Sequence, residues 1–123
     1  MYIVADHTTV EELKDLSCEA RKNILRLCHQ GATHVGGDLS MVDIMIVLYQ
    51  YAMKYDPKDL DWADRDRFIL SKGHGAGCLY VTLAMAGYFS VEELLREYRR
   101  FDGPFGEHPS KGVPGVEIAT GSL

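Results

Sequence analysis

A single short apolar run constrains the fold of this chain more than any other feature. The segment RFILSKG, residues 67–73, has the length and composition of a strand buried between helices. Helices and loops are predicted around it, and an isolated strand leaves its backbone donors and acceptors unpaired. We therefore expect an α/β fold that is mostly helical in this chain, as the opening segment of a larger domain.

Capping patterns and helical periodicity predict two helices in the first half of the chain. Thr9 and Glu12 form a capping-box pattern, and the apolar residues that follow recur at helical spacing, which predicts a helix over 9–29. Glycines then break the helical order, and Ser40 is the expected N-cap of a second helix over 41–54. This second helix is apolar on nearly every side, which predicts burial between layers.

Two further helices are predicted in the second half. One covers 75–87, directly after the predicted strand, and the other covers 91–101, where Ser90 and Glu93 form another capping-box pattern. The tail that follows is rich in proline and glycine, so we expect it to be loop almost throughout.

Length, charge and cysteine content exclude several classes of protein. At 123 residues the chain has the size of one small domain and is short for a complete enzyme with its own cofactor domain. Its formal net charge is -5 and it has no basic block, so neither nucleic acid nor a membrane is an expected partner. No secretory signal is recognisable. Cys18, Cys28 and Cys78 are widely spaced and odd in number, which is typical of reduced thiols in a cytoplasmic protein.

The glycine-rich turn SKGHGAG, residues 71–77, joins the predicted strand to a predicted helix. Such a turn presents unpaired backbone N–H groups at the positive end of the helix dipole, which favours a phosphate, and His74 can add a ring donor. The same glycines could instead serve only a tight turn, with His74 capping the helix. From the residues alone, both interpretations stay open.

Two more histidines lie in glycine- or proline-rich loops, His34 in ATHVGGDLS and His108 in GEHPSKG. Loop histidines titrate near neutrality and are candidates for binding or proton transfer. The alternative for each is a hydrogen bond to the loop backbone. No spacing in the sequence is typical of a metal site or an activated nucleophile, so we predict no metal ligands in this chain.

Three blocks of the sequence together resemble the N-terminal, diphosphate-binding part of transketolases. They are ARKNILRLCHQGATHVGGDLS, DRDRFILSKGHGAGCLYVTLAMAGYFS and GEHPSKGVPGVEIATGSL, and they cover about 20–123. The order of the blocks is similar to the form in which transketolase is split into two polypeptides. Deoxyxylulose phosphate synthase differs at the histidine block. The resemblance implies that residues 1–123 are part of a thiamine diphosphate-binding domain with a parallel sheet.

The resemblance also implies roles for matching residues. His74 corresponds to the histidine beside the diphosphate and the reacting centre, and Gly121 and Leu123 correspond to residues that contact thiamine diphosphate. His34 and His108 correspond to catalytic histidines of the substrate channel, which bind substrate oxygens and help to move protons. The implied activity is transfer of a two-carbon ketol unit from a ketose phosphate to an aldose phosphate.

The resemblance implies missing parts as well. The ligands for Mg²⁺ are expected beyond Leu123, and a pyrimidine-binding domain is expected on a C-terminal transketolase subunit or on a missing remainder of the chain, within a homo- or hetero-oligomer. The isolated chain is therefore expected to be inactive and to bind the cofactor weakly. Two departures from the family pattern are Thr33 and Asp38, the latter expected as a charge near the pocket mouth. The alternative function is a non-catalytic interaction module or oligomerising fragment, which associates with itself or with a partner through its unfinished sheet and its apolar second helix.

Overall fold

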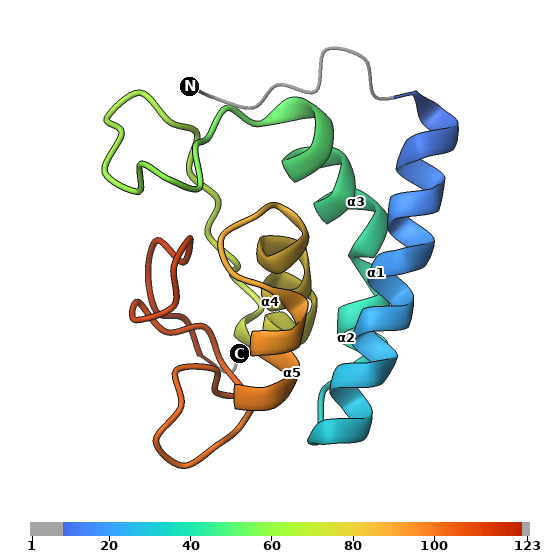
Figure 1. Cartoon of the computed structure of the whole chain (residues 1–123), viewed down its shortest axis with the longest axis vertical. Coiled ribbons are helices and arrows are strands. Elements are labelled where there is room, and N and C mark those ends of the chain that lie inside the picture. Colours follow the sequence, from blue (N-terminus) through green and yellow to red (C-terminus); the bar gives the residue numbers. More distant parts are fainter. Residues whose placement is uncertain (1–8, 122–123) are drawn as a thin grey trace.

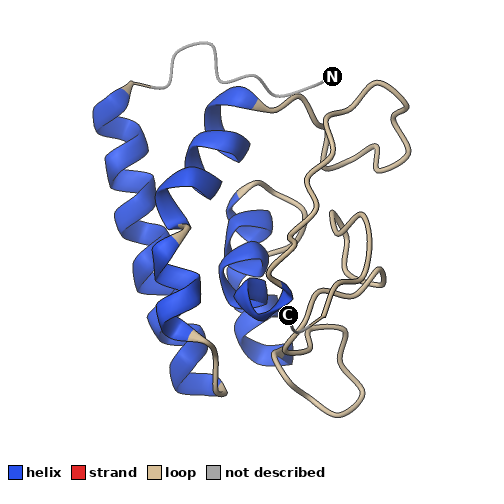
Figure 2. Cartoon of the chain, turned by 180° about the vertical axis from the view of Figure 1, so that it is seen from behind, coloured by secondary structure: helices blue, strands red, loops and turns tan. Residues whose placement is uncertain are grey.

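The computed structural model describes residues 9–121 of the chain. Its elements in this range are helices: α1 (Val10–Gln30), α2 (Val35–Ser40), α3 (Val42–Val47), the π-helix η1 (Leu48–Ala52), the 3₁₀ helix η2 (Gly73–Gly75), α4 (Ala76–Met85) and α5 (Val91–Glu97). The long helix α1 lies along one side, next to α2 and α3, and α4 lies between these helices and the loops (Figure 1). Seen from behind, the loops gather on the side opposite α1 (Figure 2).

Helix α1 begins where its capping box predicts. The Glu12 amide donates to Oγ1 of Thr9 at 3.1 Å, and the Thr9 amide donates to Oε2 of Glu12 at 2.6 Å. The helix ends at Gly31, whose N–H donates to the Leu27 carbonyl at 3.0 Å. The helix predicted over 9–29 is therefore confirmed, within one residue at each end.

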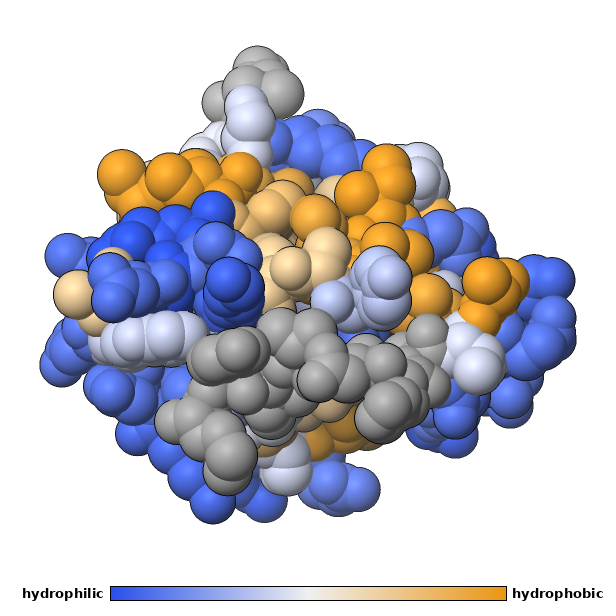
Figure 3. Space-filling model, turned by 90° about the horizontal axis from the view of Figure 1, so that it is seen from above, coloured by the Kyte–Doolittle hydropathy of each residue, from blue (hydrophilic) through white to orange (hydrophobic). Residues whose placement is uncertain are grey.

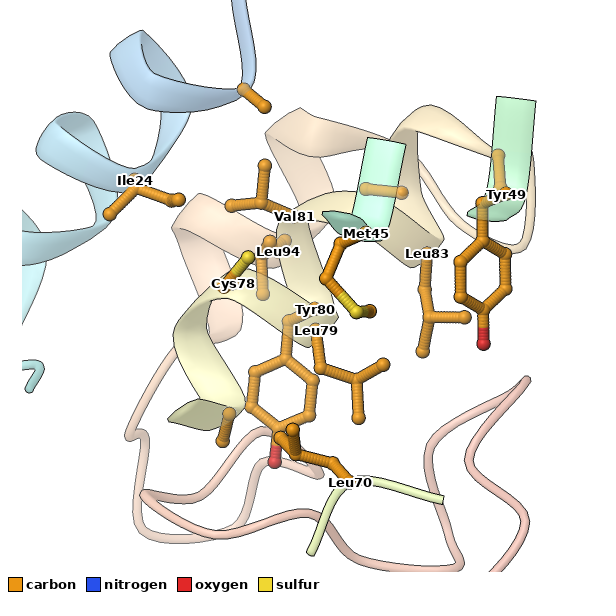
Figure 4. Close-up of a cluster of buried hydrophobic side chains, with 14 of the residues drawn as sticks. Ile24, Met45, Tyr49, Leu70, Cys78, Leu79, Tyr80, Val81, Leu83 and Leu94 are labelled. Carbon is orange, nitrogen blue, oxygen red and sulfur yellow. The ribbon is translucent and has the colours of Figure 1, made fainter. Parts of the chain in front are cut away.

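Helix α4 is the centre of the hydrophobic core. Every residue from Ala76 to Ala84 is buried, so this helix has no solvent face over those turns. Side chains from three other helices meet it, among them Ile24 of α1, Met45 of α3 and Leu94 of α5 (Figure 4). Its polar residue Thr82 is satisfied within the helix, since Oγ1 donates to the Cys78 carbonyl at 2.8 Å.

The strand predicted over 67–73 is wrong, because residues 9–121 contain helices and loops but no strand. Strands that could pair with this segment are absent from that range, so its backbone forms no ladder. Only part of the run is buried, with Leu70 6% exposed and Ile69 56% exposed. The described part of the chain is therefore all-helical, and only the expectation of a mostly helical chain is confirmed.

The region around the predicted second helix also differs from the prediction. The glycine-rich segment before it, predicted as a loop, forms the short helix α2, and Ser40 is its last residue. Ser40 is therefore not an N-cap, and its Oγ donates to the Gly37 carbonyl at 2.9 Å. The helix expected over 41–54 is divided into α3 and η1.

Helix α3 is buried on one side only, which corrects the expected burial between layers. Val42, Met45 and Ile46 face the core, at the spacing of one helical stripe. On the other side Ile44 is 64% exposed and Val47 is 40% exposed. A space-filling view from above shows apolar residues on the surface of this end of the molecule (Figure 3).

The fourth helix is shorter than the predicted 91–101. Ser90 caps it, since its Oγ accepts the Glu93 amide at 3.0 Å. Its last residue is Glu97. Two residues later, Arg99 has a left-handed backbone with φ 57°, and its N–H donates to the Phe105 carbonyl at 2.8 Å. The third helix, predicted over 75–87, is α4 preceded by η2.

The tail after α5 is loop, as predicted, and an ion pair anchors it to the loop between η1 and η2. Arg65 and Glu117 form a bidentate ion pair with distances of 3.1 and 2.8 Å, and both side chains are less than one-fifth exposed. Within residues 9–121, no helix is long and apolar enough to cross a membrane.

Replacing Leu94 with alanine should remove a fully buried side chain from the contact between α5 and α4. We expect the Leu94→Ala variant to lose about 2 to 5 kcal/mol of unfolding free energy, through lost transfer energy and a cavity. The matched control is Leu25→Ala on α1, where the side chain is 55% exposed. Urea denaturation measures both variants, and equal losses would contradict the assignment of α5 to the core.

Candidate functional site

The structure brings His34 and His74 together, although one precedes α2 and the other lies in η2. Their rings make an edge-to-face contact, with centroids 5.5 Å apart and an interplanar angle of 75°. The turn that carries His74 is closed by its own backbone, since the Gly75 amide donates to the Lys72 carbonyl at 2.9 Å. Two histidines from separate loops of the sequence therefore form one pair.

Gly37 of α2 lies directly against the ring of His74. A methyl group at this position would lie 3.1 Å from Cδ2 of His74 and 3.3 Å from Nε2, which is tighter than ordinary van der Waals contact. Glycine at this position therefore lets the backbone of α2 approach the imidazole.

Lys72, in the turn that carries His74, makes hydrogen bonds to α2. Its Nζ donates to the Gly37 carbonyl at 2.8 Å and contacts Oγ of Ser40 at 2.9 Å. A cation near the last carbonyls of a helix is favoured by the helix dipole. Sequence reasoning missed this residue, and its position beside His74 in SKGHGAG was the available signal.

Asp38 is fully buried, not at a pocket mouth as the sequence led us to expect. Its Oδ1 accepts the backbone N–H of Cys78, in the first turn of α4, at 3.0 Å. The residue at the N-cap position of α4 is Gly75, which provides no side-chain cap, so Asp38 supplies one from α2. The Cys78 amide, which the predicted phosphate site could have used, is already bonded.

Burial determines the acid–base properties of this contact. It raises the pKa of Asp38, an effect opposed by the Cys78 amide, the charge of His34 and the hydroxyl of Thr33. That hydroxyl is close, but it makes no hydrogen bond to the carboxylate, and both Oγ1 of Thr33 and Oδ2 of Asp38 are buried without a partner. Burial also raises the pKa of the Cys78 thiol to about 12, so this cysteine is not an activated nucleophile.

The end of the described chain returns to the turn that holds His74. A methyl group at Gly73 would lie 2.5 Å from the Gly121 carbonyl oxygen, so the two backbones are in direct contact. On its other side Gly121 is open, with no atom within 4 Å of a methyl group placed there, and the Thr120 hydroxyl beside it is buried without a partner. The predicted cofactor residue Gly121 therefore lies next to the histidine turn, whereas Leu123 is outside the described residues.

The third predicted histidine is attached to α4 by a different contact. The Tyr80 hydroxyl donates to the His108 carbonyl at 2.9 Å, and the Tyr80 ring packs on Phe105 with centroids 5.3 Å apart. The His108 loop is thus held against the middle of α4, while the paired histidines lie at its N-terminal end.

A cavity of about 260 Å³ lies elsewhere, between the loops that carry the Arg65–Glu117 ion pair. None of the predicted site residues lines it. The paired rings and the adjoining glycines are therefore a better candidate site than this cavity. Within residues 9–121, no three or more His, Cys, Asp or Glu side chains are grouped to hold a metal ion.

The titration of Asp38 should be visible in the stability of the chain. Because its folded pKa is raised above the ordinary value of 3.8, the wild-type chain should lose stability relative to Asp38→Asn as pH rises from that value through the folded pKa. Asp43 is the matched control, since the hydrogen bond from Arg21 lowers its pKa and the difference for Asp43→Asn should have the opposite sign. Denaturation midpoints measured from acid to neutral pH test both, and equal signs would contradict the burial of Asp38.

Comparison with known proteins places the chain in a family. Residues 11–123 match the family model described as "Transketolase, thiamine diphosphate binding domain". Transketolase of Aquifex aeolicus is 43% identical over 91 residues, which are 73% of this chain and 13% of that protein. One subunit of the apulose-4-phosphate transketolase of Actinobacillus succinogenes is 48% identical over 91 residues, 73% of this chain and 33% of that polypeptide.

Solved structures agree with this assignment. Transketolase from Leishmania mexicana superposes with a TM-score of 0.85 at 34% identity, over 95% of this chain and 18% of that one. Transketolase from Campylobacter jejuni gives a TM-score of 0.84 at 33% identity, over 92% of this chain and 18% of the other. The chain thus spans well under half the length of these relatives, and it belongs to the transketolase thiamine diphosphate-binding domain family.

Proposed function

We propose that this chain supplies one side of the thiamine diphosphate site of a transketolase, which transfers a two-carbon ketol unit from a ketose phosphate to an aldose phosphate. The observation that carries the proposal is the meeting of the His34–His74 pair with the Gly73–Gly121 contact at the N-terminal end of α4. Family membership supports the cofactor and the class of reaction.

The residues around this contact fit the cofactor. Gly121 is open on one side and the neighbouring Thr120 hydroxyl has no partner, so a ligand could approach the backbone and satisfy this hydroxyl. The imidazole of His74 offers a ring N–H for a diphosphate oxygen. Thiamine diphosphate, when bound, supplies the carbon that cleaves the donor sugar. We keep Leu123 as a further cofactor contact on the basis of resemblance alone.

The histidines of this chain would hold the substrate and move protons. In the proposal His34 and His108 donate hydrogen bonds to hydroxyl and carbonyl oxygens of the sugar, and His74 acts beside the reacting centre. Imidazole can donate at one nitrogen and accept at the other, which suits proton exchange with a hydroxyl group near neutral pH.

A metal and a partner complete the proposed site. We propose that Mg²⁺ is held by residues after Leu123, and that a C-terminal subunit or a longer form of the chain brings the remaining cofactor contacts in a homo- or hetero-oligomer. Two relatives are named as single subunits, one of an apulose-4-phosphate transketolase and one of a 6-deoxy-6-sulfo-D-fructose transketolase. Sugar phosphates remain the proposed substrate class for this chain.

A titration of the isotope-labelled chain with thiamine diphosphate and Mg²⁺ would test the site itself. We expect weak binding, because the metal ligands are proposed to lie outside the chain, with the largest amide shift changes at Gly73, His74, Gly121 and Leu123. The variant His74→Ala should weaken binding about tenfold or more, the cost of losing a hydrogen bond to a charged group. His29→Ala at the end of α1 is the control. Tight binding by the isolated chain would contradict the proposal that part of the cofactor site lies outside this chain.

A second candidate function is a non-catalytic module that associates through α3 and η1. The observation that favours it is the exposed stripe formed by Ile44, Val47 and Tyr51, which are 64%, 40% and 53% exposed.

Light scattering at increasing concentration separates this second function from the first. Association through the stripe should raise the average mass, and Ile44→Lys should abolish the rise, since a charge on an apolar interface must be desolvated. Leu25→Lys, on an exposed position of α1, is the control. A monomer at every concentration would contradict the second candidate but not the first, whose proposed hetero-oligomer needs a C-terminal subunit that is absent from the sample.

A further inference from the structure

Helix α2 is too short to be stable by itself. It has six residues, two of which are glycines, and isolated helices well above this length are marginal in water. It follows His34 directly, so the position of that histidine depends on what holds α2 in place.

Asp38 provides a contact in two directions at once. Its own backbone N–H donates to the His34 carbonyl at 2.9 Å, and its carboxylate accepts the Cys78 amide at 3.0 Å. The first bond belongs to α2, and the second ties α2 to the buried helix α4, which begins two residues after His74. One residue therefore connects the segments that carry the two paired rings.

The space around the carboxylate leaves little freedom. A methyl group at Gly77 of α4 would lie 2.7 Å from Oδ2 of Asp38, which is closer than such contacts occur. On the same turn of α2, Gly37 lies against the His74 ring. Two glycines, one from each helix, thus allow the close approach of α2 to the start of α4.

Lys72, two residues before His74 in the chain, also holds α2 in place. It is fixed to the Gly37 carbonyl and to Ser40, at the end of α2 opposite His34. Side-chain contacts to the segment 72–78 thereby hold α2 at Gly37, Asp38 and Ser40.

We propose that Asp38 is a positioning residue, which sets His34 against His74 by docking α2 on the first turn of α4. What the paired rings do in catalysis rests on the proposed function, but the positioning itself does not. The positioning requires only the side-chain oxygen that accepts the Cys78 amide. An asparagine side chain, which also has such an oxygen, should therefore position His34 as the carboxylate does.

The test is the nuclear Overhauser effect between the ring protons of His34 and His74 in the 123-residue chain, together with the amide signal of Cys78. We expect Asp38→Ala to lose the cross peak between the rings, and Asp38→Asn to keep it along with the Cys78 amide shift. The control Asp43→Ala, which removes an exposed carboxylate paired with Arg21, should behave as wild type.

The Gly77→Ala variant perturbs the contact between Asp38 and α4 from the side of α4. Alanine normally stabilises a helix relative to glycine, but here its methyl group must displace Asp38, so the cross peak should be lost as in Asp38→Ala. Leu94→Ala serves as a reference for general destabilisation, because it lowers stability at the contact between α5 and α4 and should keep the cross peak.

Two results would overturn the proposal. One is a cross peak that persists in Asp38→Ala or Gly77→Ala, and the other is its loss in Asp38→Asn, a variant that keeps shape and acceptor and is expected to fold. Because no cofactor or activity enters the measurement, its outcome is independent of whether the chain serves a transketolase.

Discussion

The hydrogen bond from the Cys78 amide to Asp38 is the interaction on which the candidate site depends. Helix α4 is buried on all sides over most of its length, so the amides of its first turn have no access to water and need partners within the protein. A carboxylate from another helix meets this need at Cys78. The cost of burying that charge is partly offset by the helix dipole and by the neighbouring His34 and Lys72.

Local patterns explain the parts of the fold that could be predicted from the sequence. The capping box at Thr9 and the N-cap at Ser90 act over one turn and are visible as residue spacing. The strand over 67–73 was wrong, because extended backbone counts as a strand only when a partner pairs with it. The π-helix η1 was not predicted either, since nothing in its sequence distinguishes it from the end of an α-helix.

The candidate site was predictable only in part, for a related reason. Loop location singled out His34 and His74 as separate candidates, and family resemblance gave both a role near one cofactor. Their ring contact depends on α2, whose glycines argue against a helix and whose stability comes from residues far along the chain. Asp38 and Lys72 act through such distant contacts, so neither was predicted in its observed role.

The charges around the paired histidines have a consequence for any anionic ligand. Asp38 contributes a negative charge and Lys72 a positive one, both tied to α2. The formal charges of these two side chains cancel. A polyanion that enters here would find donors that can orient it but no net positive charge from these two side chains, so a counterion bound to the ligand would have to balance its charge.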